Sequence, residues 1–547
     1  MHDHDTDNTT AATATTAVNA IEIEVARNRL TSIAEEVGTA LIRTSYSPNI
    51  KDRRDCSAGI YAADGTLISQ AEHIPLHLGL MPTLISNALE EYGADRLRPG
   101  DVLMTNNPYL GGSHLPDMCV ITPVFVAGTV TALVATMAHH VDMGGIVPGS
   151  MATQATEIFQ EGIRVPPIRL FAGGELQRES LELLLMNIRT ADKTRGDLMA
   201  QVAANRLGER RILELVGEWG ADGFRQSCEA LVDYGERRTR AALAKLPDGT
   251  GTFTDHLEHD GVEPVDIPVT ATVTVSGEDI VIDLTGTADQ VQGAVNCSYA
   301  VARACAAYVV KILADPSLPS NAGLMAPIEV RTRPGSLVHA EFPAPVAHGN
   351  TQTSQRIVDA ILGAFEQFTD GLVPAASSGS MSIVTIGGVD PRDGQYYSYV
   401  ETYGGGQGAS PASDGASATH THMTNTRNTP CEVIEREYPL RVDSYGIVRG
   451  TGGAGDHRGG DGLYRQLSLT RGEATVVAGT SRVTTAPWGL GGGAPGSSAA
   501  VRYHHDGTAE PRPSMSRFDL TAGEGVSIST AGGGGYGASG AGAVGSR

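Results

Sequence analysis

The sequence predicts a mixed α+β fold in three regions: an N-terminal α/β region at 19–250, a central α+β region at 251–400, and a glycine-rich, mostly β region at 401–536. Apolar residues recur every three to five positions between 21 and 44, as on an amphipathic helix. Apolar and polar residues alternate instead at 269–284, which is typical of half-buried strands. Helices and strands do not follow one another regularly, so a repeating βαβ fold is not expected.

The elements of the first region follow from local patterns. A helix is expected over 21–44, followed by a hairpin with strands at 58–62 and 66–70. A second helix is expected near 80–92, and the strand 102–105 follows a Pro-Gly-Asp turn. These elements lead directly into the most polar stretch of the chain.

Later elements are predicted by the same reasoning. The expected helices cover 181–186, 193–216, 221–246, 298–313 and 354–368, and a strand pair is expected at 328–338. Glycine clusters from residue 404 onward indicate short strands joined by tight turns, and the charged stretch 432–439 is expected to form a turn and a strand. The sequence therefore predicts a large chain of several layers, whose candidate site lies in the N-terminal region.

Residues 106–145 carry that candidate site. His114 and Asp117 precede an apolar segment with a central Gly128, and His139 follows it. The segment predicts two strands joined by a tight turn, and a hairpin returns its far end beside its start. We therefore expect His114, Asp117 and His139 to face one point and leave positions open for water or substrate, as at a catalytic divalent metal.

The same residues also have an ordinary structural explanation. Histidines at strand ends often serve as hydrogen-bonding residues, and Asp117 after Pro116 could close a turn. The density of His and Asp at the two strand ends, next to two pairs of glycines, favours the metal site because glycines permit a close approach of the backbone.

Other polar residues are weaker candidates. Asp55 begins a predicted strand and could supply a further carboxylate. His73 and His77 could line a pocket, although Pro75 prevents a regular helix between them.

His420 and His422 alternate in a stretch that is expected to be extended, so they would lie on one face of it. They could hold a second metal ion, but contacts with substrate or with another protein are the stronger interpretation.

The composition excludes several classes of function. The formal net charge of −22 would repel nucleic acid and anionic membranes. No lysine follows a glycine, so a GxxxxGK[ST] phosphate loop is absent and any ATP would be bound by another chain. The six cysteines form no CxxC motif and suit a reducing, cytoplasmic environment.

The ends of the chain are expected to be tails. Residues 1–18 lack the basic and apolar regions of a signal peptide and are predicted to be disordered, and 537–547 are predicted to be flexible. No stretch of about 18 apolar residues occurs, so no membrane span is expected.

Seven motifs occur in the order in which one family carries them, between about residues 20 and 536: RTSYSPNIKDRRDCSAGIY, NNPYLGGSHLPDM, HHVDMGG, EIFQEGIRVPP, ETYGGGQGA, HMTNTRNTPCEVIEREYPLRV and GGAGDHRGGDG. In these motifs the chain resembles the hydantoinase B/5-oxoprolinase family. That family includes the B subunit of N-methylhydantoinase, half of 5-oxoprolinase, and the large subunits of acetone and acetophenone carboxylases.

The resemblance implies a site and a partner. The metal ligands of the family fall on His114, Asp117 and His139, with Asp55 as a further candidate, and the metal would be Mn, Zn, Fe or Co. The resemblance further implies that two neighbouring residues orient ligands or handle protons, His140 and Asp142. A hydantoinase A-like subunit would bind ATP and phosphorylate the substrate, in a hetero-oligomer such as α2β2.

Three functions compete at this point. The leading hypothesis is the B subunit of an ATP-dependent hydrolase that opens a hydantoin, 5-oxoproline or a related lactam. The second is a subunit of an ATP-dependent ketone carboxylase, in which the same metal would stabilise an enolate. The third is a scaffold without activity, which would have no need for the His and Asp cluster.

Overall fold

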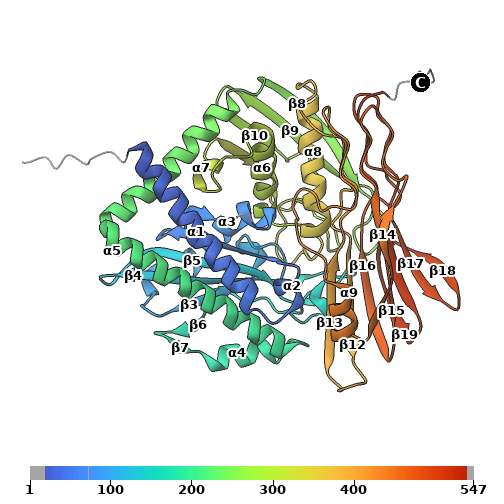
Figure 1. The fold of residues 1–547 in the computed structure, drawn as a ribbon, viewed down its shortest axis with the longest axis horizontal. Helices are drawn as coiled ribbons and strands as arrows, with labels where there is room; N and C mark the ends of the chain where they lie inside the picture. The colour runs from blue at the N-terminus through green and yellow to red at the C-terminus, as the bar shows by residue number, and fades with distance from the viewer. Residues whose placement is uncertain (1–18, 72, 539–547) are drawn as a thin grey trace, which may run out of the picture.

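A computed structural model describes residues 19–71 and 73–538 and confirms a mixed α/β fold with several sheets (Figure 1). The tails predicted at 1–18 and 537–547 lie outside the described residues, apart from Gly537 and Ala538. Within the described part of the chain, no helix is long and apolar enough to cross a membrane.

The N-terminal half is built on a seven-stranded sheet in which every neighbouring pair is antiparallel. Its order is β2-β1-β5-β4-β3-β6-β7, with bounds β1 Cys56–Ala62, β2 Leu67–Gln70, β3 Val102–Thr105, β4 Asp117–Val126, β5 Thr129–His139, β6 Ile168–Ala172 and β7 Glu175–Leu176. The predicted hairpin of the candidate site is the central pair β4–β5, which is confirmed.

Alternation along the strands gives this sheet two buried faces. In β5, Val134 and Ala138 pack with α1 (Ala20–Thr44) and α5 (Ala191–Leu243) on one face. Leu133, Ala135 and Met137 point to the other face and join the core around α3 (Pro75–Tyr92). Successive side chains of a strand point to opposite faces, so each strand of the hairpin contributes to both cores.

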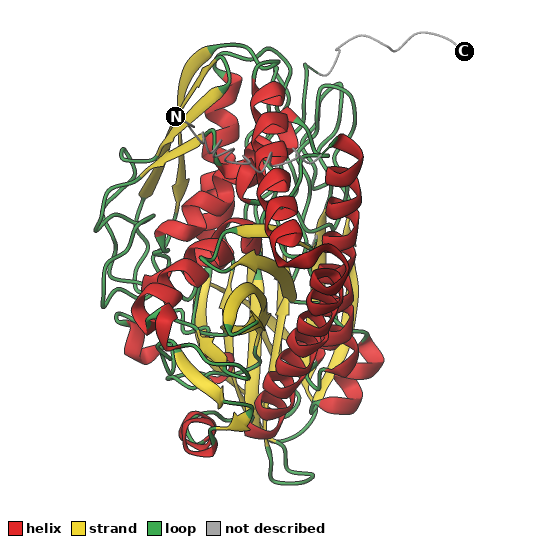
Figure 2. Cartoon of the chain, turned by 90° about the vertical axis from the view of Figure 1, so that its left-hand side faces the viewer, coloured by secondary structure: helices red, strands yellow, loops and turns green. Residues whose placement is uncertain are grey.

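Helix α5 is bent at Gly220, which lies between the two helices predicted at 193–216 and 221–246. Gly220 has φ 75° and ψ 158°, a conformation that side chains other than glycine rarely adopt. Residues of both halves share one core with α1, and Figure 2, which faces the side where α1 and α5 lie in Figure 1, shows helices in front of the strands. The short α4 (Arg178–Leu185) precedes them.

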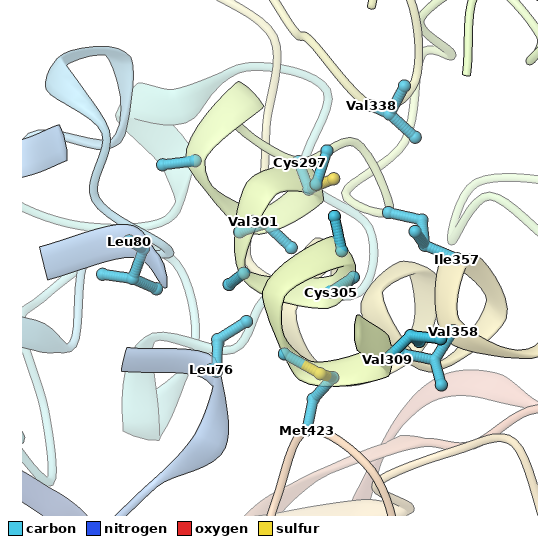
Figure 3. Packing of buried hydrophobic residues seen from close by; sticks show 14 of the residues in the cluster. Leu76, Leu80, Cys297, Val301, Cys305, Val309, Val338, Ile357, Val358 and Met423 are labelled. Carbon is cyan, nitrogen blue, oxygen red and sulfur yellow. The ribbon is translucent and has the colours of Figure 1, made fainter. Parts of the chain in front are cut away.

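The central region packs on the far side of the first sheet. Its four-stranded sheet has the order β11-β10-β9-β8, with bounds β8 Gly249–Leu257, β9 Ile267–Ser276, β10 Asp279–Asp283 and β11 Ile328–Arg331. Helix α6 (Tyr299–Ala314) lies between α3 and α8 (Ser354–Glu366), and Figure 3 shows Val301 and Cys305 of α6 among side chains of both neighbours. One continuous core therefore joins the N-terminal and central regions.

The C-terminal region is a sandwich of two antiparallel sheets, seen edge-on beside the helices (Figure 1). One sheet is β13-β12-β16-β19, with bounds β12 Ile383–Val389, β13 Tyr396–Thr402, β16 Glu473–Gly479 and β19 Met515–Thr521. The other is β14-β15-β20-β17-β18, with bounds β14 Leu440–Val448, β15 Gly462–Leu469, β17 Ala500–His505, β18 Thr508–Arg512 and β20 Gly525–Ser529. Their facing residues form a shared core.

Some predicted elements differ from the structure. Helix α3 begins at Pro75, because proline is well accommodated in the first helical turn, so it starts earlier than expected. Of the strand pair expected at 328–338, only β11 forms. The charged stretch after Pro430 forms the helix α9 (Cys431–Glu437), where a turn and strand were expected. The short α2 (Pro48–Lys51) and α7 (Ala322–Met325) were not predicted.

Strands β12 and β13 pair with the C-terminal sandwich although they precede residue 403. The proposed division at 400 stays a prediction, since pairing alone does not define domains.

A buried ionic network joins the sandwich to the central region. The Arg482 side chain, after β16, contacts Asp255 of β8 at 2.7 Å and Asp359 of α8 at 2.9 Å, and all three residues are buried. Arg356 lies 3.5 Å from Asp359 in the same network. Charges this deeply buried are tolerated only when they are paired.

We expect Arg482→Met to lower the free energy of unfolding by about 3–5 kcal/mol, because it leaves buried carboxylates short of a partner. Denaturant unfolding measures the change. Arg211→Met is the control: Arg211 pairs with Glu36 and Glu214 at an exposed surface, so its removal should leave the midpoint unchanged. Equal effects of the two substitutions would contradict the importance of the network.

Candidate metal centre

Pairing of β4 with β5 assembles the candidate site. Asp117, the first residue of β4, lies opposite His139, the last residue of β5. Residues directly opposite in an antiparallel pair bring their side chains within about 5 Å of each other. His114 lies in the turn immediately before β4, so the hairpin positions all three predicted residues at one end.

The three side chains converge as the sequence predicts. His114 Nε2 lies 3.2 Å from His139 Nδ1 and 3.2 Å from Asp117 Oδ2. His139 Nδ1 lies 3.2 Å from Asp117 Oδ1. All three residues are buried. Within residues 19–71 and 73–538, this is the one group of three or more His, Cys, Asp or Glu residues whose ligand atoms gather closely enough to hold a metal ion.

Neighbouring groups hold these side chains in place. His114 Nδ1 lies 3.0 Å from the carbonyl oxygen of Ala347, and Ser113 Oγ donates to Asp117 Oδ2. The backbone N–H of His139 donates to the carbonyl oxygen of Asp55. Supporting contacts of this kind fix the rotamers of metal ligands.

Glu161 supports the segment that orients His114. Its Oε1 accepts hydrogen bonds from the backbone N–H of Val346 at 2.7 Å and of Ala347 at 2.8 Å. Complete burial raises the pKa of Glu161 to about 8, although the two N–H donors oppose the shift. The carboxyl group of Glu161 therefore holds the carbonyl of Ala347 where the imidazole of His114 needs it.

The electrostatics of the cluster favour an anionic Asp117. Burial disfavours its charge, but His114 and the other hydrogen-bonding partners hold the pKa of Asp117 well below its usual range. Burial likewise disfavours the imidazolium of His114, but Asp117 outweighs burial and raises the pKa of His114. The pair attracts positive charge, whether a proton or a cation.

The donor set fits a divalent metal. A carbonyl oxygen only accepts hydrogen bonds, so His114 carries its proton on Nδ1 and presents the Nε2 lone pair to the cluster. His139 Nδ1 and the Asp117 carboxylate supply two further donors. Two imidazoles and one carboxylate suit Mn, Zn, Fe or Co and leave coordination positions open.

The cluster faces a small cavity with one polar and one apolar side. The polar side includes Arg53, Asp55, His77, Asn350 and Thr402. The apolar side consists of residues from several distant segments: Ile74, Leu76, Met381, Ile383, Val400 and Met423. A lining that combines apolar side chains with a few polar groups is typical of small-molecule sites, in which the polar groups orient the ligand.

Asp55 lines this cavity, but it does not belong to the close group of ligand atoms. Its carboxylate lies 3.6 Å from the Arg53 guanidinium. Its assignment as a further ligand stays a prediction.

His140 and Asp142 are not among the residues that line the cavity. His140 follows His139 directly, so strand alternation turns its ring to the opposite face, where Nε2 lies 3.0 Å from Gln201 Oε1 of α5. Asp142 accepts from the backbone N–H of Gly144 and Gly149 and pairs with Arg189 at 3.1 Å. These contacts stabilise the loop after β5, and the roles expected of His140 and Asp142 in orienting ligands or handling protons stay predictions.

The remaining histidine candidates do not gather at one site. His77 lines the cavity, with Nε2 3.7 Å from Asp117 Oδ2 and Nδ1 2.9 Å from Ser57 Oγ. His73 lines a neighbouring pocket instead. His422 has φ 58°, which interrupts the extended segment that was expected, and it lies 3.5 Å from Asp359. The described residues provide no metal-binding group that includes His420 or His422.

Sequence reasoning missed Arg53 and Asn350 as parts of the site. Arg53 belongs to a charged run that is typical of a solvated loop, yet its side chain is 1% exposed and donates to Val400 O and Thr402 Oγ1. Asn350 lies more than 200 residues after the hairpin, and no local pattern signals its approach to His114. Only the tertiary fold brings these residues together.

Residues 19–539 match the model of the Hydantoinase B/oxoprolinase family. 5-oxoprolinase 1 of Arabidopsis thaliana is 34% identical over 544 residues, a match covering 94% of this chain and 42% of that protein. A putative B subunit of a D-/L-hydantoinase from Pseudomonas sp. (strain NS671) is 33% identical over 540 residues, covering 95% and 90%. The chain thus spans less than half the length of 5-oxoprolinase 1.

Two solved structures have a similar fold. The ATP-dependent caprolactamase from Pseudomonas jessenii has a TM-score of 0.89 and 29% identity, covering 95% of this chain and 91% of that one. An acetone carboxylase in a nucleotide-free structure has a TM-score of 0.86 and 19% identity, covering 94% and 75%. At 19% identity the likeness concerns the fold alone.

We expect His114→Ala to abolish metal binding without unfolding the chain, because it removes one donor from a cluster supported by its neighbours. Elemental analysis of the purified protein measures the metal content, and circular dichroism checks the fold. His140→Ala is the matched control: it removes the adjacent imidazole on the opposite face and should leave the metal content unchanged. Full metal content in His114→Ala would contradict the ligand set.

Metal affinity should fall as the pH drops through the raised pKa of His114. A proton on Nε2 occupies the lone pair that a metal needs, so proton and metal compete. Above that pKa the competition ends and the affinity becomes independent of pH. Competition with a chromophoric chelator between about pH 5.5 and about pH 8.5 measures this dependence. An affinity that rises on acidification would contradict the assigned donor atoms.

Proposed function

Because the chain belongs to the hydantoinase B/oxoprolinase family, we propose that it is the metal-bearing subunit of an ATP-dependent cyclic-amide hydrolase. Its substrate would be a phosphate-activated hydantoin, 5-oxoproline or related lactam. The observation that carries the proposal is the buried cluster of His114, Asp117 and His139 beside a cavity. The relatives named as a hydantoinase subunit, a 5-oxoprolinase and a caprolactamase support this substrate class.

The chemistry requires an activated carbonyl, because a ring amide is a poor electrophile near neutral pH. A divalent cation held by the cluster would act as a Lewis acid and lower the pKa of water toward neutrality. The apolar side of the cavity, including Met381 and Val400, would exclude bulk water and hold the methylenes of the ring. The fixed rotamers of the ligands keep the polar groups in place during the reaction.

We propose His77 as a residue that transfers a proton to the leaving ring nitrogen. His77 is the remaining imidazole on the polar side of the cavity, and Ser57 holds its Nδ1 at 2.9 Å. Its Nε2 could therefore donate a proton as the C–N bond breaks. Histidine suits such a transfer because its ordinary pKa is close to neutral.

ATP would be bound outside this sequence, by a hydantoinase A-like subunit in a hetero-oligomer. The absence of a GxxxxGK[ST] loop from residues 1–547 and the relative named as one subunit of a hydantoinase support this division of labour. The larger size of 5-oxoprolinase 1 is consistent with further functions outside the matched region.

Co-expression with a hydantoinase A-like protein tests the proposal. With ATP and a divalent metal, the complex should open hydantoin, 5-oxoproline or caprolactam, and His114→Ala in the same complex should reduce turnover by at least about 100-fold. Bicarbonate-dependent consumption of acetone without ring opening would favour the ketone carboxylase. Ring opening that is unaffected by His114→Ala would favour a scaffold role for this chain.

A further inference from the structure

Asn350 lies on an unusual turn beside the metal cluster. The turn is the π-helix η5 (Gly349–Thr353), which leads into α8, and the Asn350 side chain is 8% exposed. A Cβ on Gly349 would approach the carbonyl oxygen of Asn296 to 2.0 Å, so the turn is pressed against the backbone there. Single π-helical turns are rare and occur frequently at functional sites, where the additional residue displaces a side chain sideways.

The two ends of the Asn350 amide have different surroundings. Its Nδ2 lies 3.2 Å from His114 Nε2, whereas its Oδ1 is buried and has no hydrogen-bond partner. A buried amide oxygen without a donor is costly and rare in folded proteins. Asn350 is also one of the residues that line the cavity beside the cluster.

The contact with His114 is incompatible with a metal on the same nitrogen. When His114 is neutral, its proton lies on Nδ1 against the carbonyl oxygen of Ala347, and the Asn350 N–H then donates to the Nε2 lone pair. A divalent cation in the cluster takes that lone pair. Metal binding therefore releases the Asn350 amide nitrogen, and the cavity then contains one free donor next to one free acceptor.

We infer that Asn350 recognises the amide edge of a cyclic substrate: Nδ2 donates to the ring carbonyl oxygen, and Oδ1 accepts from the ring N–H. Ring closure holds the amide of a small lactam in the cis form, so its C=O and N–H point to the same side. The primary amide of asparagine has the complementary arrangement on one edge. A protonated, O-phosphorylated ring retains the N–H, so the contact with Oδ1 survives activation.

This recognition distinguishes cyclic amides from ketones. A ketone has the acceptor oxygen but no N–H, so it would leave Asn350 Oδ1 without a donor. A buried site that is built to pair with a polar group discriminates strongly against an analogue that lacks it. The inference rests on the proposed function and names the residue that selects its substrate class.

Ligand binding to the metal-loaded, full-length chain tests the inference without ATP or a partner. The two probes are 2-pyrrolidinone and cyclopentanone, in which CH₂ replaces N–H at nearly constant shape. We expect the natural protein to bind the lactam about tenfold more tightly than the ketone. In Asn350→Leu the two affinities should agree within about twofold. Calorimetry or ligand-observed NMR measures both dissociation constants.

Two further variants separate recognition from structural damage. Asn350→Asp keeps an acceptor oxygen but loses the amide donor, so both probes should bind more weakly while the lactam preference remains. Thr351→Val removes a hydroxyl group from the same turn, where it contacts His348, and should leave the preference intact. The metal content of all three variants should equal that of the natural protein, because Asn350 is not needed as a ligand.

Several results would overturn the inference. They are an unchanged lactam preference in Asn350→Leu, equal binding of both probes to the natural protein, or loss of metal from Asn350→Leu while Thr351→Val retains it. Each is independent of the proposed function, which is judged by ring opening with ATP and the partner. If the complex opens the ring and Asn350→Leu still prefers the lactam, the proposed function stands and the role inferred for Asn350 is wrong.

Discussion

The register of one strand pair determines the chemistry of this protein. Asp117 faces His139 across β4 and β5, and both side chains point toward the core around α3. A shift of one residue would turn Asp117 to the opposite face, where Met118 and Val120 pack with α4 and α5, and would separate the cluster. The buried residues of both strands resist that shift, because each strand contributes apolar side chains to two different cores. The packing of these two cores therefore maintains the geometry of the ligands, although most of the packed residues lie away from the site.

The same alternation explains why adjacent histidines have different roles. His139 belongs to the face of Met137 and joins the cluster, whereas His140 belongs to the face of Ala138 and contacts Gln201 of α5. Burial lowers the pKa of His140. The neutral imidazole of His140 connects β5 to α5 through Gln201. Its position next to a metal ligand in the sequence therefore does not place it beside the metal cluster.

Much of the hairpin and its ligands could be predicted from sequence because the information is local. His114, Asp117 and His139 lie within 26 consecutive positions. Strand periodicity with a central glycine is sufficient to predict the hairpin that joins them. The helices α1, α6 and α8 have equally clear periodicity. Proline in a first helical turn and the helix α9 were misjudged, because local rules permit more than one outcome at such positions.

The rest of the site could not be predicted, because it depends on contacts between distant segments. Arg53 and Asn350 lie almost 300 residues apart in the sequence, and Val400 and Thr402 belong to a strand of the C-terminal sandwich. Their environments, and not their local patterns, determine their roles: an arginine in a charged run becomes buried, and an asparagine on a π-turn keeps an unpaired oxygen.

Assembly of the cavity from three regions also constrains how the site can respond to a ligand. Arg53 is bound to the backbone and side chain of β13, and Ala347, near the start of η5, accepts the hydrogen bond of His114. The N-terminal sheet, the central helices and the sandwich therefore meet around the cavity. A movement of the sandwich would change the polar side of the cavity before it changed the metal cluster, because β4, β5 and the turn before β4 carry all three ligands. Metal binding and substrate recognition are accordingly separable properties, the first belonging to one hairpin and the second to the fold as a whole.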